Sequence, residues 1–241
     1  MVQKEFNLKE TVHRLLTPQE TLAPWIFDEN QKMLSDVRRK LLDMAQKMID
    51  ETIAPIKGLE VTDICLHGSL SDYFYHDKSD IDLFIEVKNK SCQSIAKDQK
   101  HFDMFLSSQT ATYRKHPFFS QNRLIDIKMG VNEIQFVGVY SILNDKWRIK
   151  PNKDIIKGLT EENMIAYYEK RKREILKEKQ KIIEKHSGMK LGSALNDFYV
   201  QTVLGNLNIK DYYVFKLLNY ERILKPIGAE SVYAYNRVLR L

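Results

Sequence analysis

An apolar, strand-like segment, DIDLFIEV, carries Asp80 and Asp82 two positions apart. Successive side chains of a strand point to opposite faces. Both carboxylates are therefore predicted to lie on one face, about 7 Å apart along the strand. Carboxylates held this close repel one another and call for a counter-cation. Mg2+, or Mn2+ in its place, binds through one or two carboxylates together with substrate phosphates, so the segment predicts a metal site.

A second signal lies just upstream, where the apolar run Ile64–Leu66 breaks at Gly68-Ser69. Glycine lets the backbone turn tightly and approach a ligand without a side chain in the way. The residues that follow, LSDYFY, are predicted to start a helix whose first N–H groups point at an anion, with Ser69 or Ser71 adding a hydroxyl or a cap. A phosphate-binding turn followed by paired acids predicts a site for a nucleoside triphosphate, NTP.

This arrangement resembles the polymerase-beta-like nucleotidyltransferase superfamily. Its pattern is a hydrophobic residue, Gly-Gly or Gly-Ser, a short spacer, and then acid, hydrophobic residue, acid, hydrophobic residue. The matching residues are Leu66, Gly68, Ser69, Asp80, Ile81, Asp82 and Leu83. Within the superfamily, residues 20–151 look similar to nucleotidyltransferases carried by large tailed phages, through GSLSDYFYHDKSDIDLFIEV and NEIQFVGVYSILNDKWRIKP.

The resemblance implies a third acid on a neighbouring strand. The best match is Asp126 in RLIDIKMG, and Glu133 and Glu86 are the alternatives. It further implies that the three acids hold two Mg2+ or Mn2+ ions. Catalysis would then transfer an NMP from an NTP such as ATP to an acceptor hydroxyl and release pyrophosphate.

Cationic side chains are also expected near the phosphates of the NTP. Gly68 and Ser69 are the predicted nucleotide-binding turn, and the candidates for neutralising the departing phosphates are Lys170, Arg173 and Lys216.

The order of patterns along the 241 residues predicts an α+β fold with two domains. Residues 1–151 would form a nucleotidyltransferase-type core, a mixed sheet flanked by helices, and residues 152–241 a helical domain. In the core we expect an irregular lead-in over the first 34 residues and a helix from Ser35, its N-cap, to before Pro55. Strands are expected near 61–67, 80–87, 123–129 and 133–142, a helix near 91–108, and a hairpin turned at Asn144-Asp145.

Beyond Pro151 the apolar spacing becomes helical. A long helix is expected after Thr160, ending near Ser187-Gly188. Further helices are expected in GSALNDFYVQTVLGNL, DYYVFKLLNYERIL and AESVYAYNRVLRL.

Charge is distributed unevenly along the chain. Residues 1–150 hold 21 Lys and Arg against 21 Asp and Glu, a balance of zero, whereas residues 151–241 hold 17 against 11, a balance of +6. A basic region beside a phosphate-transfer site suits an RNA or tRNA acceptor, and four tyrosines offer faces for stacking on bases: Tyr199, Tyr212, Tyr213 and Tyr220. The alternative is an ordinary solvated helix surface, because acids alternate with the bases in this region.

Four classes of function remain open at this point. The acceptor is an RNA or tRNA 3′ end, an antibiotic-like small molecule, or a protein side chain or second nucleotide. The different-class alternative is a non-catalytic nucleotide-binding protein that retains the fold. No apolar run approaches the roughly 20 residues that span a bilayer, so we expect no membrane partner and a cytoplasmic location, in the host cytoplasm if the chain is phage-encoded.

Overall fold

The computed structural model describes residues 6–77, 79–89, 116–118, 123–130, 138–186 and 208–221. These residues divide into two compact units. The sheet unit runs from Gln19 to Lys153, and the helical unit joins the residues before Gln19 to those from Asp154 onward.

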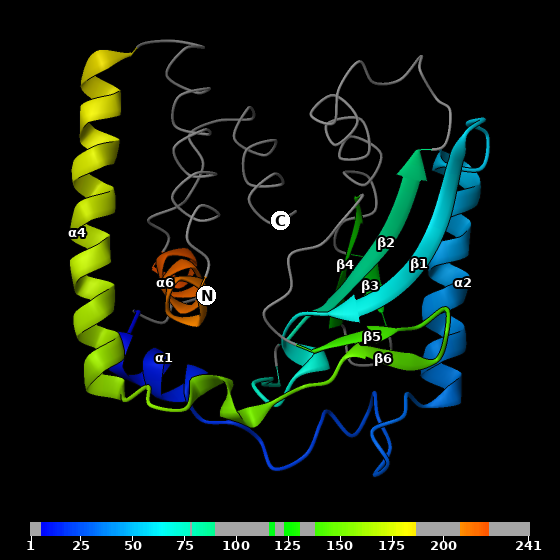
Figure 1. Ribbon diagram of the computed structural model, residues 1–241, viewed down its shortest axis with the longest axis horizontal. Helices are drawn as coiled ribbons and strands as arrows, with labels where there is room; N and C mark the ends of the chain where they lie inside the picture. Colours follow the sequence, from blue (N-terminus) through cyan, green and yellow to red (C-terminus); the bar gives the residue numbers. More distant parts are fainter. Residues whose placement is uncertain are drawn as a thin grey trace. The chain divides into compact units, whose positions relative to one another are not determined.

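One six-stranded sheet organises the described part of the sheet unit (Figure 1), in the order β3-β4-β2-β1-β5-β6. Only β2 and β4 pair in parallel among these neighbours, and the other pairs are antiparallel. A mixed sheet together with helices confirms the α+β class. The strand bounds are β1 Leu59–His67, β2 Ile81–Asn89, β3 His116–Phe118, β4 Arg123–Gly130, β5 Val139–Ser141 and β6 Lys146–Ile149.

The predicted strands are found close to their expected places. β1, β2 and β4 match the predictions near 61–67, 80–87 and 123–129. Of the strand expected near 133–142, the described part is β5, and the hairpin to β6 turns as predicted, with Asp145 at a φ of 54°. The helix expected near 91–108 and Glu133 lie outside the described residues.

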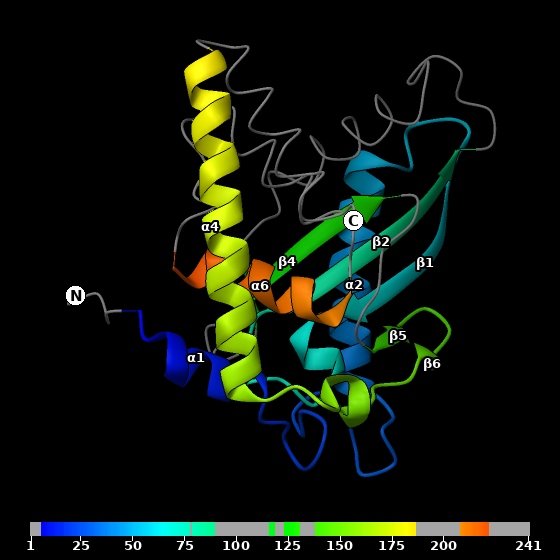
Figure 2. The same ribbon diagram turned by 60° about the vertical axis from the view of Figure 1, so that its left-hand side comes forward.

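Helix α2, Ser35–Thr52, covers one face of the sheet (Figure 2). Its predicted apolar face is buried: Val37, Leu41, Ala45, Met48 and Ile49. These side chains share one hydrophobic core with the inward-facing residues of the strands, among them Ile64, Leu66, Leu83, Ile85, Ile125, Ile127 and Met129. The expected N-cap was wrong by one residue. Leu34 occupies the cap without a side-chain hydrogen bond, and Ser35 is already helical.

Among the described residues, the helical unit contains α1 Leu8–Leu15, α4 Glu161–Lys185 and α6 Ile209–Tyr220. Two short 3₁₀ turns are also present, η1 Ser69–Ser71 in the sheet unit and η3 Lys153–Ile156 where the two units join in sequence. α4 begins as predicted, since the Thr160 hydroxyl accepts a hydrogen bond from the Asn163 N–H. Met164, Tyr168, Tyr213 and Leu217 lie in the core of this unit. The other two helices expected beyond Pro151 lie outside the described residues.

We expected the first 34 residues to be irregular, but they contain helix α1. Asn7 caps α1 by accepting a hydrogen bond from the Glu10 N–H. Val12 and Leu15 then join the core formed by α4 and α6. Residues 6–18 therefore belong with the helical unit, whereas the expected boundary placed residues 1–151 in one domain. No helix in the described ranges is long and apolar enough to cross a bilayer.

Candidate functional site

The strands place Asp82 and Asp126 side by side on one face of the sheet. In the parallel ladder between β2 and β4, Asp82 pairs with Asp126, while Ile81 and Leu83 pair with Ile125 and Ile127. The isoleucines and Leu83 are buried in the core under α2. Because side chains alternate along a strand, the two carboxylates project from the opposite face. Asp80 lies one residue before β2, close enough to both carboxylates for their charges to act on it.

A lysine lies between the paired acids. Lys128 follows Asp126 by two residues on β4 and so points to the same face. Its Nζ is 3.3 Å from Asp126 Oδ2 and 3.7 Å from Asp82 Oδ1, and its side chain is 5% exposed. Lys128 was not among the residues predicted from the sequence, although the alternation rule that groups Asp80 with Asp82 also groups Asp126 with Lys128 in DIK.

The site carries more negative than positive charge. Asp80 reaches solvent, yet the protein around it removes part of its hydration, and this desolvation raises the pKa of Asp80. The negative charges of Asp82 and Asp126 raise the same pKa, while a backbone hydrogen bond and the Lys128 ammonium group lower it. Three carboxylates close to one ammonium group favour a further cation nearby.

Gly68 lies against one of these carboxylates. It directly follows His67, the last residue of β1, which pairs with Asp82 across the antiparallel ladder. Its φ of 78° is in the region that favours glycine, and a Cβ added there would lie 2.1 Å from Asp82 Oδ2. Any other residue at this position would both strain the backbone and displace the Asp82 carboxylate.

The Gly-Ser turn is tied to the segment that leads into Asp80. Ser69 Oγ donates to Ser79 Oγ at 3.0 Å, and Ser79 Oγ also accepts from the His76 N–H at 3.0 Å. These bonds join the two ends of the connection between β1 and β2. The predicted phosphate turn and the predicted metal acids are therefore one linked piece of structure.

The helix expected after Gly68-Ser69 is only the single turn η1. It ends because Asp72 takes an extended conformation, with φ −141° and ψ 175°. Ser71 is buried, and its Oγ lies 2.9 Å from the Gly68 carbonyl oxygen and 2.5 Å from that of Gly138. Ser71 therefore fixes the turn to the start of β5, and the expected run of helical N–H groups for an anion is not formed.

Of the alternative third acids, Glu86 lies on the same face of β2 but is already engaged. It pairs with Arg148, which also pairs with the buried Asp63. Glu133 lies outside the described residues. Asp126 is thus the acid that the described strands place opposite Asp82.

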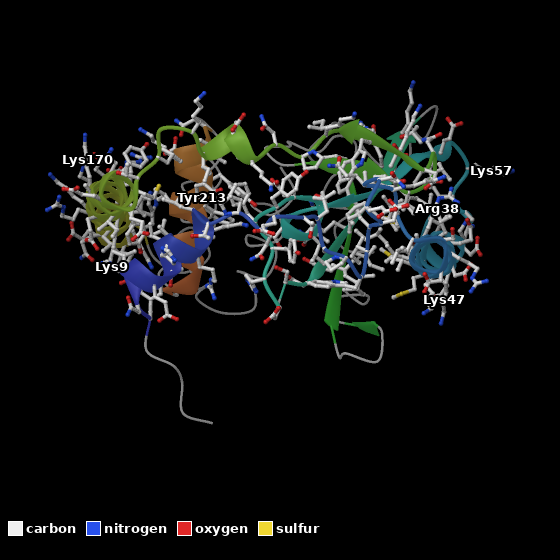
Figure 3. The ribbon with its side chains drawn as sticks, turned by 90° about the horizontal axis from the view of Figure 1, so that it is seen from below. Lys9, Arg38, Lys47, Lys57, Lys170 and Tyr213 are labelled. Atoms are coloured by element: carbon white, nitrogen blue, oxygen red, sulfur yellow. The ribbon has the colours of Figure 1, made fainter. Side chains whose placement is uncertain are left out.

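The predicted phosphate-neutralising residues lie on helices of the helical unit, whereas the three acids belong to the sheet unit. Lys170 and Arg173 are exposed on α4, and Lys216 on α6 has its Nζ 4.8 Å from the centre of the Tyr212 ring. Figure 3 shows Lys170 pointing outward from α4, and Tyr213 inside the unit, where it is 2% exposed. Tyr213 is therefore a packing residue, whereas Tyr199 and the side chain of Tyr220 lie outside the described residues.

The donor set suits a hard divalent cation in its chemistry, because carboxylate oxygens are the ligands that Mg2+ prefers. The close approach of Gly68 to Asp82 also keeps side-chain bulk away from that carboxylate. In the described residues, however, no three His, Cys, Asp or Glu side chains are already arranged around a point where a metal ion would sit. Asp82 and Asp126 are turned to Lys128 instead.

We compared the chain with known protein families, curated proteins and solved structures. No family model matches the chain, and no curated protein or solved structure matches it either.

Proposed function

We propose that this chain is a metal-dependent nucleotidyltransferase that transfers an NMP from an NTP to an acceptor hydroxyl and releases pyrophosphate. The observation that carries the proposal is the pairing of Asp82 with Asp126 across two parallel strands, with Asp80 beside them and Gly68 against the Asp82 carboxylate. Phosphoryl transfer needs concentrated negative ligands for a metal and a turn that admits phosphates, and these residues combine both.

Each residue has a defined part in this proposal. Asp80, Asp82 and Asp126 are the ligands for divalent metal, and the Gly68-Ser69 turn is the binding turn for the triphosphate. A bound Mg2+ would neutralise phosphate charge and lower the pKa of the acceptor hydroxyl. The acceptor hydroxyl loses its proton to water and its oxygen forms a bond to the α-phosphorus, while the bond from that phosphorus to the bridging oxygen breaks as pyrophosphate leaves.

The acceptor that we favour is an RNA or tRNA 3′ end. Its support is the basic balance of residues 151–241 together with the exposed bases of α4, including Lys170, Arg173 and Lys177. Several other α4 bases are paired with acids, such as Lys172 with Glu221, and these contribute less to an RNA surface. Lys170, Arg173 and Lys216 remain candidates for contacts with the NTP phosphates.

The test is to incubate the full chain with each α-labelled NTP and Mg2+ or Mn2+, offering total RNA, protein and small-molecule fractions in turn. Label in the RNA fraction, lost on treatment with ribonuclease, is the expected result. Label in a small molecule, in protein or in a dinucleotide would keep the chemistry and replace the acceptor. Absence of label in every fraction, with a folded protein that binds NTP, would contradict nucleotidyl transfer.

A nucleotide-binding protein without chemistry is the second candidate. One observation favours it: Lys128 already contacts two of the three acids, and no metal cluster is preformed among the described residues. Tight NTP binding that is indifferent to EDTA would support this candidate. NTP binding that requires Mg2+ would support the enzyme.

A further inference from the structure

Lys128 is a buried cation placed between two acids from neighbouring strands. Burying an ammonium group costs free energy unless carboxylates replace its hydration. Asp82 and Asp126 supply that replacement at 3.7 and 3.3 Å, and Lys128 in turn offsets their mutual repulsion. The three side chains thus stabilise one another without a metal.

The surroundings make these charges strongly dependent on each other. Phe84 pairs with Lys128 across the ladder and is 2% exposed. Charges that lie away from water interact more strongly than charges in bulk solvent. Removing the ammonium group should therefore weaken the electrostatic stabilisation of both carboxylates.

We propose that Lys128 is a positioning residue that holds Asp82 and Asp126 together before a divalent cation binds, and that the cation then competes with the ammonium group for the same carboxylates. This inference rests on the proposed function, because it takes these acids as metal ligands. Lys128 would keep the site assembled in the absence of metal and would lower its affinity for metal. Binding of the cation would release the ammonium group from the carboxylate oxygens.

The experiment measures Mn2+ binding by electron paramagnetic resonance on the full chain, without nucleotide or acceptor. Lys128→Met removes the charge and keeps much of the side-chain length. We expect it to bind Mn2+ at least about tenfold more tightly than the wild type, because a close positive charge no longer opposes the cation. In EDTA the same variant should melt at a lower temperature, and Mg2+ should raise its melting temperature more than that of the wild type.

Lys88→Met is the matched control. Lys88 is an exposed residue of β2, six positions beyond Asp82 and so about 20 Å along the strand. Its removal changes the net charge by the same amount, and we expect no change in Mn2+ affinity. If Lys128→Met does not fold, Lys128→Gln offers a second neutral variant for the same measurement.

The outcomes separate this inference from the proposed function. Equal or weaker Mn2+ binding by the neutral variant, with clear binding by the wild type, would overturn the role of Lys128 alone. Absence of Mn2+ binding by both proteins would overturn the metal site and this inference together. Tighter binding by the variant combined with a lower melting temperature in EDTA is the result that supports it.

Discussion

Two clusters on the same face of the sheet contain two carboxylates and one base each, and they differ in what else surrounds them. In the structural cluster, Arg148 on β6 bridges Asp63 on β1 and Glu86 on β2. In the site cluster, Lys128 bridges Asp82 and Asp126. Asp82 and Glu86 are four residues apart on β2, about 13 Å along one strand face.

The structural cluster is saturated with hydrogen bonds. Asp63 Oδ1 accepts from the Ile64 N–H at 2.8 Å and from Ser141 Oγ at 2.6 Å, while Arg148 binds Asp63 Oδ2. A guanidinium fork matches several acceptors at once, whereas an ammonium group acts as a point charge. Such a cluster has little to offer an incoming cation.

The site cluster has the opposite character. It includes Asp80 as a further acid, and its base makes two contacts longer than 3 Å to the paired carboxylates. Gly68 packs so closely against Asp82 that no side chain fits between them. A pair of acids on a sheet indicates chemistry when carboxylates outnumber their cationic partners, and architecture when every acceptor is satisfied.

The largest expected difference is between Asp82→Asn and Glu86→Gln, which each remove one negative charge from the same face of β2. Asp82→Asn should reduce NMP transfer below detection with the circular dichroism spectrum unchanged, because a proposed metal ligand is lost. Glu86→Gln should keep the rate of transfer within about threefold of the wild-type rate, since Glu86 forms its ion pair with Arg148 and not with the site acids. A comparable loss of transfer in Glu86→Gln would make Glu86 a site acid and break the comparison.

Gly68→Ala should have the next largest effect. Its Cβ would meet Asp82 Oδ2 at 2.1 Å, so the carboxylate must move, and we expect transfer to fall about a hundredfold. Gly158→Ala is the control: Gly158 also has a positive φ, of 83°, but an added Cβ there meets nothing within 4 Å. Both variants should lose about 1 kcal/mol of stability through backbone strain, and only Gly68→Ala should lose activity. Equal activities would contradict the contact.

Arg148→Met tests the structural cluster through stability. It leaves the buried Asp63 carboxylate without its guanidinium partner, and we expect a loss of about 2 kcal/mol, reduced from that of a fully buried pair because Arg148 is partly exposed. Thermal melts with and without Mg2+ measure it. The loss should persist in Mg2+, in contrast to Lys128→Met. Recovery of Arg148→Met by Mg2+ would show that the structural cluster also binds metal.

The smallest expected effect concerns Cys65, which lies within the structural cluster. Burial, followed by the negative charge of Asp63, raises the pKa of the Cys65 thiol well above its usual range, so the thiolate is scarce at pH 8. In a Cys92→Ser background, iodoacetamide should label Cys65 slowly in the folded protein. Arg148→Met should slow labelling a few-fold further, because the Arg148 guanidinium group lowers the pKa of this thiol and its loss makes the thiolate scarcer. Unchanged labelling would mean that burial alone protects the thiol.

Much of this fold follows from local patterns. Two-residue alternation predicted the β2 face with Asp82, and the apolar spacing from Val37 to Ile49 predicted α2. Helix α1 could have been predicted from its N-cap, since Asn7 lies three residues before Glu10. Pro18 and Pro24 instead led us to expect irregular structure in that region. The missing helix after Ser69 followed from Asp72, whose extended backbone is fixed by burial rather than by its neighbours in sequence.

The contacts that distinguish the two clusters were beyond local patterns. Asp63 and Arg148 are 85 residues apart, and nothing near either residue indicates the other. Asp82 and Asp126 likewise meet only because β4 pairs with β2. Strand order is set by the packing of the whole sheet, so the expectation of a third acid came from resemblance to a family rather than from the residues between the strands.

The parallel pairing of β2 with β4 has a consequence for how this protein is made. β1 and β2 are antiparallel and separated by a short connection, so Gly68 and Asp82 can come together early in folding. A parallel partner requires a long crossover, and contacts between distant residues form slowly because the chain between them must first be closed into a loop. We therefore expect Asp126 and Lys128 to reach Asp82 late, so that the cluster of acids stays incomplete until β4 has docked.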